Sequence, residues 1–154
     1  MNRTRALLVI PCIAAVALVI AGCGGPAASP SPAGTSIDVT LQEWAVVPSA
    51  ATAPAGQVTF VITNDGPADI HEFVVMKTDL SVHELPVDAN GKVDEAAGGM
   101  TVIDEVEDIP VGEIEPLTVN LDAGNYALIC NIYDTDEGEA HYTMGMRAAF
   151  TVTE

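Results

Sequence analysis

The sequence predicts an all-β domain, a Greek-key β-sandwich or barrel, on the evidence of its strand-length patterns and its turns. Val58, Phe60 and Ile62 alternate with polar neighbours, which is the period of a strand with one buried face. Clusters of glycine, proline, asparagine and aspartate separate such runs, and patterns long enough for a helix are few. Short strands joined by frequent turns favour an antiparallel sandwich or a Greek-key barrel.

The expected strands follow one another along the chain with turn residues between them. They are the alternating or apolar runs at residues 37–41, 58–63, 71–78, 117–121, 126–130 and 147–153. The acidic segment Leu80–Asp108 is only partly patterned, so we expect a loop there, with room for a helical turn and a strand over Thr101–Val106. Trp44 is a candidate core residue.

The first 22 residues are typical of a secretory signal peptide. Arg3 and Arg5 supply a positive start, and the apolar run Ala6–Ile20 is too short for an ordinary membrane-spanning helix. Small residues then lead into Cys23, which resembles the lipobox of bacterial lipoproteins, where the cysteine is acylated. The alternative is an ordinary cleaved signal with a cysteine nearby. We expect residues 1–22 to be a lipoprotein signal peptide and Cys23 to carry the lipid.

Residues 23–35 are expected to be a flexible tether, and residues 36–154 to be the folded domain. The tether is rich in Gly, Pro, Ala and Ser and lacks charged and large apolar groups, so it cannot bury enough surface to offset the entropy of ordering it. The domain is large enough for one β-sandwich core. With the lipid on Cys23, this organisation predicts a protein anchored at the outer face of the cytoplasmic membrane.

The charge of the chain restricts its partners. Lys and Arg number 5 and Asp and Glu number 22, a formal net charge of −17. Loss of Arg3 and Arg5 with the signal leaves 3 basic residues against 22 acidic ones, or −19. Nucleic acid and anionic lipid headgroups are poor partners for such a surface, whereas a basic protein is a plausible one. The charge could equally serve solubility or salt tolerance.

The cysteines single out one thiol. Cys12 leaves with the signal and Cys23 takes the lipid, so Cys130 stands alone in the domain and no disulfide can form within it. A solitary thiol in an oxidising compartment is expected to be buried or bound to something.

The loop after Cys130 carries the groups of a metal site. It offers the thiolate of Cys130, the imidazole of His141 and a thioether, and His71 opens a strand far back in the sequence. Two imidazoles and a thiolate with a weak axial thioether make a blue-copper site, because soft sulfur favours Cu(I) while imidazole also suits Cu(II). Met144 and Met146 compete for the axial position. We favour Met146, which follows a glycine and leads directly into the last strand.

The domain resembles the cupredoxins of the plastocyanin and azurin type over about residues 37–152. The motifs that carry the resemblance are Gly124-Asn125-Tyr126, Cys130, His141, Gly145-Met146, the closing strand from Ala149, and upstream Val58–Asn64 followed by His71–Val75. The resemblance implies a cupredoxin-like sandwich with one type 1 copper ion, held in plane by His71, Cys130 and His141 and axially by Met146.

The chain departs from the family pattern at two places. The loop between Cys130 and His141 is longer than in the simplest members, with an acidic insert over Tyr133–Glu139. Glu72 stands where the family commonly has an asparagine that braces the ligand loop. Because the acids of the insert match no known calcium loop, we interpret it as a solvated loop rather than a cation site.

These features predict a monomeric one-electron carrier that is not an enzyme. Its expected partner is a redox protein, basic where it docks, such as a cytochrome or an oxidase domain, and the electron is expected to leave through an exposed imidazole edge of His141. The alternative is a copper storage or delivery module without redox turnover. Copper enzymes need further histidines, and this chain offers only His83, expected to be solvated, beyond the two ligands.

Overall fold

The computed structural model describes residues 34–154. The predicted signal peptide, Cys23 and most of the predicted tether lie outside the described residues. The first strand begins at Thr35, and the chain from Pro32 to Glu154 forms one compact unit. Within the described residues, no helix has the length and apolar character needed to cross a membrane.

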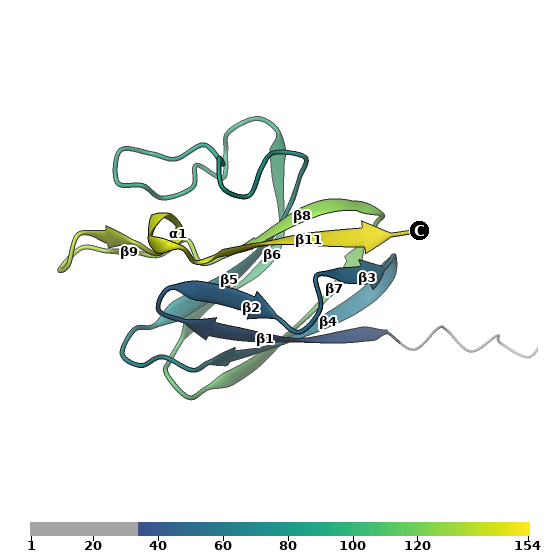
Figure 1. The fold of residues 1–154 in the computed structure, drawn as a ribbon, viewed down its shortest axis with the longest axis horizontal. Coiled ribbons are helices and arrows are strands. Elements are labelled where there is room, and N and C mark those ends of the chain that lie inside the picture. The colour runs from purple at the N-terminus through teal and green to yellow at the C-terminus, as the bar shows by residue number, and fades with distance from the viewer. Residues whose placement is uncertain (1–33) are drawn as a thin grey trace, which may run out of the picture. The chain divides into compact units, whose positions relative to one another are not determined.

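Two β-sheets pack face to face as a sandwich (Figure 1). The first sheet has the order β2–β1–β4–β7 and comprises β1 (Thr35–Gln42), β2 (Ala45–Pro48), β4 (Gly56–Asn64) and β7 (Ile114–Leu121). The second has the order β3–β11–β8–β5–β6 and comprises β3 (Thr52–Pro54), β5 (His71–Thr78), β6 (Met100–Ile109), β8 (Gly124–Ile129) and β11 (Arg147–Thr153). A small hairpin of β9 (Tyr133–Asp134) and β10 (Glu139–Ala140) precedes α1 (His141–Met144).

The main core lies between the two sheets and follows the alternation seen in the sequence. Val58, Phe60 and Ile62 of β4 are fully buried, while the residues between them are half-buried. The Phe60 ring lies 5.3 Å from that of Phe73 on β5 and 5.5 Å from that of Phe150 on β11. These contacts join the sheets and stabilise the sandwich beyond the burial of apolar area alone.

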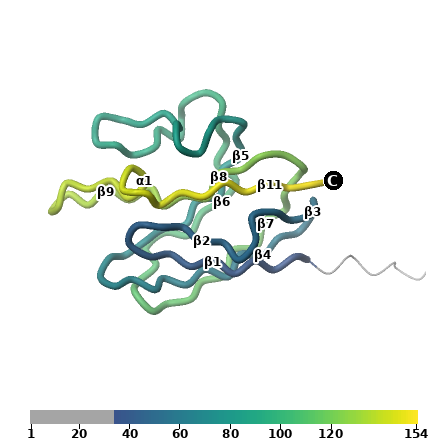
Figure 2. Tube along the Cα trace, in the orientation of Figure 1, coloured from purple at the N-terminus to yellow at the C-terminus, as the bar shows by residue number. Residues whose placement is uncertain are grey.

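A second apolar cluster covers the outer face of the second sheet. Val74 and Met76 of β5 and Ile129 of β8 pack there against residues 82–93. The segment between β5 and β6 therefore forms a cover, seen as a separate arch in Figure 2. Because β5 and β8 are buried on both faces, they read as nearly continuous apolar runs rather than as alternating ones.

The predicted sandwich and all its expected strands are present, the strand at 101–106 within β6 included. The structure corrects three details. The sheets are mixed rather than purely antiparallel, since β1 pairs with β4 and β3 with β11 in parallel. Residues 80–99, all of them described, contain no helix. The one helical turn of the described chain instead lies at α1, after the acidic insert.

Candidate metal centre

Strand pairing brings the predicted ligands to one end of the second sheet. In the antiparallel pair of β5 and β8, Val74 lies opposite Ile129, so the start of β5 at His71 meets the end of β8 at Cys130. In the pair of β8 and β11, Arg147 lies opposite Ile129, and the Cys130 N–H donates to the Met146 carbonyl at 3.1 Å. Figure 1 shows α1 and the β1–β2 turn at this end of the sandwich, opposite the C-terminus.

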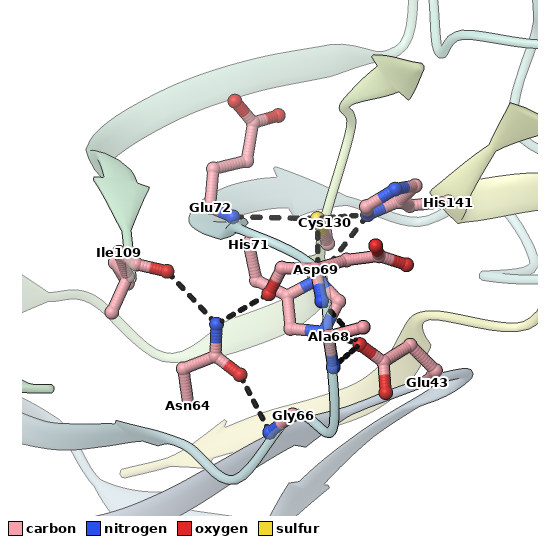
Figure 3. Close-up of polar contacts among 10 residues, drawn as sticks. All are labelled: Glu43, Asn64, Gly66, Ala68, Asp69, His71, Glu72, Ile109, Cys130 and His141. Atoms are coloured by element: carbon pink, nitrogen blue, oxygen red, sulfur yellow. Dashed lines mark hydrogen bonds and ion pairs between the residues drawn. The ribbon is translucent and has the colours of Figure 1, made fainter. Parts of the chain in front are cut away.

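Three donor atoms form a small triangle inside the protein. His71 Nδ1 lies 3.2 Å from His141 Nδ1, and Cys130 Sγ lies 3.3 Å from His141 Nδ1 and 4.0 Å from His71 Nδ1. The three side chains are buried. Figure 3 shows them meeting beside Glu72 and above the loop at Ala68 and Asp69.

This triangle has the size that a transition-metal ion requires. A point equidistant from the three atoms lies about 2.1 Å from each, as their separations dictate. Metal–imidazole bonds of about 2.0–2.1 Å and metal–thiolate bonds of about 2.3 Å are the usual values for a zinc ion of similar size. The residues therefore fit a trigonal metal ion without rearrangement of the backbone.

Burial controls the protonation of the donors before a metal binds. It lowers the pKa of His71, which the neighbouring His141 lowers further, and it also lowers the pKa of His141. Both rings are therefore neutral at neutral pH and can offer a nitrogen lone pair. Burial raises the pKa of the Cys130 thiol to about 12. Binding a metal ion must therefore displace the thiol proton.

The structure distinguishes the two candidate axial methionines by burial. Met146 is fully buried in the core cluster that contains Cys130, whereas the side chain of Met144 is 43% exposed. Met146 N–H also donates to the His141 carbonyl, which closes the ligand loop. Burial thus favours Met146, and its ligation by sulfur stays a prediction.

Polar contacts hold the ligand strands in place. The buried Asn64 side chain accepts the Gly66 N–H and donates to the carbonyls of Asp69 and Ile109, so it braces the loop that leads into His71 (Figure 3).

Glu72 accepts the Asn131 N–H at 2.7 Å, and its own N–H points to Cys130 Sγ at 3.4 Å. Burial raises the pKa of the Glu72 carboxyl. Its side-chain oxygen thus provides a hydrogen-bond acceptor for the start of the ligand loop.

Sequence reasoning missed the turn between β1 and β2, which covers both histidines. Trp44 packs edge-on against the His141 ring at 5.0 Å, and Glu43 Oε1 lies 4.0 Å from His71 Nε2. Gly145 is necessary for this contact, because its φ is 136° and a Cβ there would lie 2.8 Å from the Trp44 carbonyl oxygen. The sequence predicts Trp44 only as a core candidate, because nothing in the local pattern links this turn to the ligand loop.

The Glu43 carboxylate is anchored by the loop that enters His71. Its Oε1 accepts the N–H groups of Ala68 and Asp69 at 2.9 and 2.6 Å. Burial acts to raise its pKa, but these hydrogen bonds outweigh burial and the pKa lies below its ordinary value. The carboxylate is therefore ionised at neutral pH.

The expectation of an exposed His141 edge is wrong, because only 2% of the His141 surface is accessible. Trp44 packs against its ring, and His141 is one of the residues that line an open hollow on the surface. Residues that line this hollow include Asp69, Ile70, Asp108, Tyr133, Asp136 and His141. The burial of the imidazole therefore depends on Trp44, which comes from the turn between β1 and β2.

The other candidate residues lie outside the donor triangle. His83 is exposed, as expected, and its Nδ1 accepts the Arg147 Nε–H at 3.1 Å. In the acidic insert, Asp134 accepts the N–H groups of Asp136 and Glu137, which makes a local turn. These contacts agree with a solvated loop.

Comparison with known proteins shows the fold. No family model and no curated protein matches the chain. An auracyanin from Roseiflexus castenholzii is similar at 23% identity and a TM-score of 0.56, over 79% of this chain and 99% of its own. Auracyanin A from Chloroflexus aurantiacus, described as a "blue" copper protein, has 17% identity and a TM-score of 0.53, over 79% of this chain and 100% of its own. An azurin from Methylomonas sp. strain J has 17% identity and a TM-score of 0.52, over 79% of this chain and 100% of its own.

The domain therefore has the cupredoxin fold, as the sequence predicts. At these identities the likeness establishes the fold, and the metal follows from the chemistry of the donors. Two buried imidazoles and one buried cysteine sulfur, with a buried methionine in the same cluster, form the donor set of a type 1 copper centre.

Proposed function

We propose that this protein binds one type 1 copper ion and carries single electrons at the outer face of the cytoplasmic membrane. The observation that carries the proposal is the triangle of His71, Cys130 and His141 donor atoms, already of the right size. Bound copper would supply a one-electron couple. With that couple the protein would accept an electron from a one-electron donor protein and pass it to an acceptor protein.

The protein holds the ligand side chains in nearly the same positions in both oxidation states. His71 opens a strand of the sandwich, and Cys130 is tied by its backbone to Met146 at the start of β11. A donor set held by two paired strands cannot relax far toward the geometry that either oxidation state alone prefers. This rigidity favours fast electron transfer.

Burial favours a carrier over a storage or delivery module. Every predicted ligand is at most 2% exposed, so a recipient protein could not reach the metal without opening the fold. A delivery site needs at least one ligand within reach of the recipient. We therefore propose that the site exchanges electrons with its partners and retains its copper ion.

The hollow above His141 is the proposed place where redox partners dock. Its lining includes the acidic side chains of Asp69, Asp108, Asp134 and Asp136 together with His141. Acidic groups there favour a partner with a basic docking face, a cytochrome or an oxidase domain. The rate of electron exchange with a cationic redox complex should then fall as salt is added, and the rate with an anionic complex should rise.

A visible absorption spectrum tests the copper site. The chain Pro32–Glu154, a compact unit on its own, is mixed with Cu(II). We expect an intense thiolate-to-copper band that is absent in Cys130→Ser and that bleaches and returns through reversible one-electron reduction. No band would contradict the copper site, and a band that cannot be cycled would contradict electron transfer.

The membrane location is tested on the full chain in a bacterial host. Acylation of Cys23 predicts that the protein partitions with membranes and that Cys23→Ser is released in soluble form. Equal partitioning of both forms would contradict the lipid anchor.

A further inference from the structure

The outer nitrogen of His71 has no partner, although it is buried. His71 is fully buried, and its Nε2 makes no hydrogen bond among the described residues. The nearest acidic atom is Glu43 Oε1 at 4.0 Å. The second carboxylate oxygen, Glu43 Oε2, is also buried and without a partner among these residues. The unpartnered ring nitrogen therefore lies beside a buried carboxylate that has one oxygen free of hydrogen bonds among these residues.

Metal ligation decides where the imidazole hydrogen must be. The Nδ1 atom of His71 points into the donor triangle, at 3.2 Å from His141 Nδ1, so its lone pair is the one offered to a metal. A neutral imidazole carries one hydrogen, which then has to sit on Nε2. A buried N–H without an acceptor is unfavourable, and Glu43 is the acceptor that the fold supplies.

The Glu43 carboxylate is already positioned for this role. Two backbone N–H groups, of Ala68 and Asp69, hold Oε1 in place, and both belong to the loop that enters β5 (Figure 3). The Glu43 side chain is only 11% exposed. A movement of about 1 Å closes the remaining gap to hydrogen-bonding distance. Partners of this kind orient metal-ligating histidines and increase their basicity.

Resting on the proposed copper site, we propose that Glu43 is the positioning residue of His71. Its carboxylate accepts the Nε2 hydrogen, selects the tautomer that presents Nδ1, and places a negative charge behind the ligand. That charge stabilises Cu(II) more than Cu(I), so Glu43 lowers the reduction potential of the site. The turn at Glu43 and Trp44 thus contacts both histidines, one through a carboxylate and the other through an indole.

The test compares Glu43→Gln with Asp65→Asn in the chain Pro32–Glu154. The amide of glutamine keeps an oxygen for the N–H groups of Ala68 and Asp69 and removes the charge. Asp65 is also acidic and lies in the loop between β4 and β5 that leads into His71, but its side chain is exposed. We expect Glu43→Gln to weaken Cu(II) binding relative to Cu(I) about tenfold, a rise of about 59 mV for one electron. Asp65→Asn should move the potential far less. Equal potentials in the two variants would overturn the proposal.

A second readout does not depend on copper. In the Zn(II)-loaded wild-type chain, we expect the His71 Nε2–H proton to exchange slowly with water and to resonate far downfield in the NMR spectrum. In Glu43→Gln that signal should shift and exchange faster, while Asp65→Asn leaves it in place. If wild-type chain showed no thiolate-to-copper band, the copper function would be wrong, and this zinc spectrum would still decide the role of Glu43. An unchanged signal in Glu43→Gln would overturn it.

Discussion

Replacing Tyr142 by phenylalanine should release the cover formed by the segment between β5 and β6. The buried Tyr142 hydroxyl donates to the Val82 carbonyl at 2.9 Å and accepts the Leu85 N–H at 3.0 Å. Removing it leaves two backbone groups unsatisfied beneath the cover, at about 1–3 kcal/mol each when buried. Because the cover can partly rehydrate, we expect a total loss of about 2–4 kcal/mol in the free energy of unfolding.

Thermal unfolding of the metal-free chain Pro32–Glu154, followed by circular dichroism, measures this loss. For a domain of this size, about 4 °C of melting temperature corresponds to 1 kcal/mol, so the melting temperature should fall by about 8–16 °C. Tyr133→Phe is the matched control, because Tyr133 lies half-buried in the β9–β10 hairpin, away from the cover. A fall of less than about 2 °C in Tyr142→Phe, or an equal fall in the control, would refute the anchoring role.

Three further predictions concern stability. Asn64→Ala removes the acceptor of the Gly66 N–H and the donor to two carbonyls. The free energy of unfolding measured in urea should therefore fall by about 2–4 kcal/mol. A fall of less than about 0.5 kcal/mol would contradict the bracing role of Asn64. The pKa values of His71 and His141 lie below their ordinary 6.5 in the folded chain, so the unfolded chain takes up protons first. The free energy of unfolding of the metal-free chain should therefore fall as pH drops below about 6.5. Zinc should make that fall steeper, because the bound rings take up no proton in the folded chain and binding also displaces the Cys130 thiol proton. A pH-independent stability would contradict the prediction. The net charge of −17 predicts that raising NaCl from about 0.05 to 1 M increases the melting temperature by screening repulsion, and no increase would show that this repulsion is unimportant.

Much of the candidate site could be predicted from the order of residue types along the chain. Cys130 is the single thiol of the domain, and a histidine and a methionine follow it before the last strand. In a pair of antiparallel strands, the end of one strand lies beside the start of the other. The end of β8 therefore lies beside the start of β11. The assignment of His71 as the second histidine ligand depended mostly on the resemblance to the cupredoxins. The structure places His71 at the same end of the sheet as Cys130.

Residues that contact the site from another part of the chain could not be predicted in this way. Glu43 and Trp44 lie 28 and 27 residues before His71 in the sequence. The turn that they form has no local sequence pattern that indicates a metal site. The burial of His141 was predicted wrongly for the same reason. Exposure of a loop residue depends on what packs over it, and here that is Trp44 from the other sheet.

The sequence by itself determined the strand pattern, the chemical identity of the donors and their spacing, because these depend on side-chain type and on a period of two residues. The tertiary structure alone decided the size of the donor triangle, the closure of the site by the β1–β2 turn, and the cover held by Tyr142. Those features depend on how two sheets and a long loop pack against one another. Packing brings together residues that no local periodicity relates.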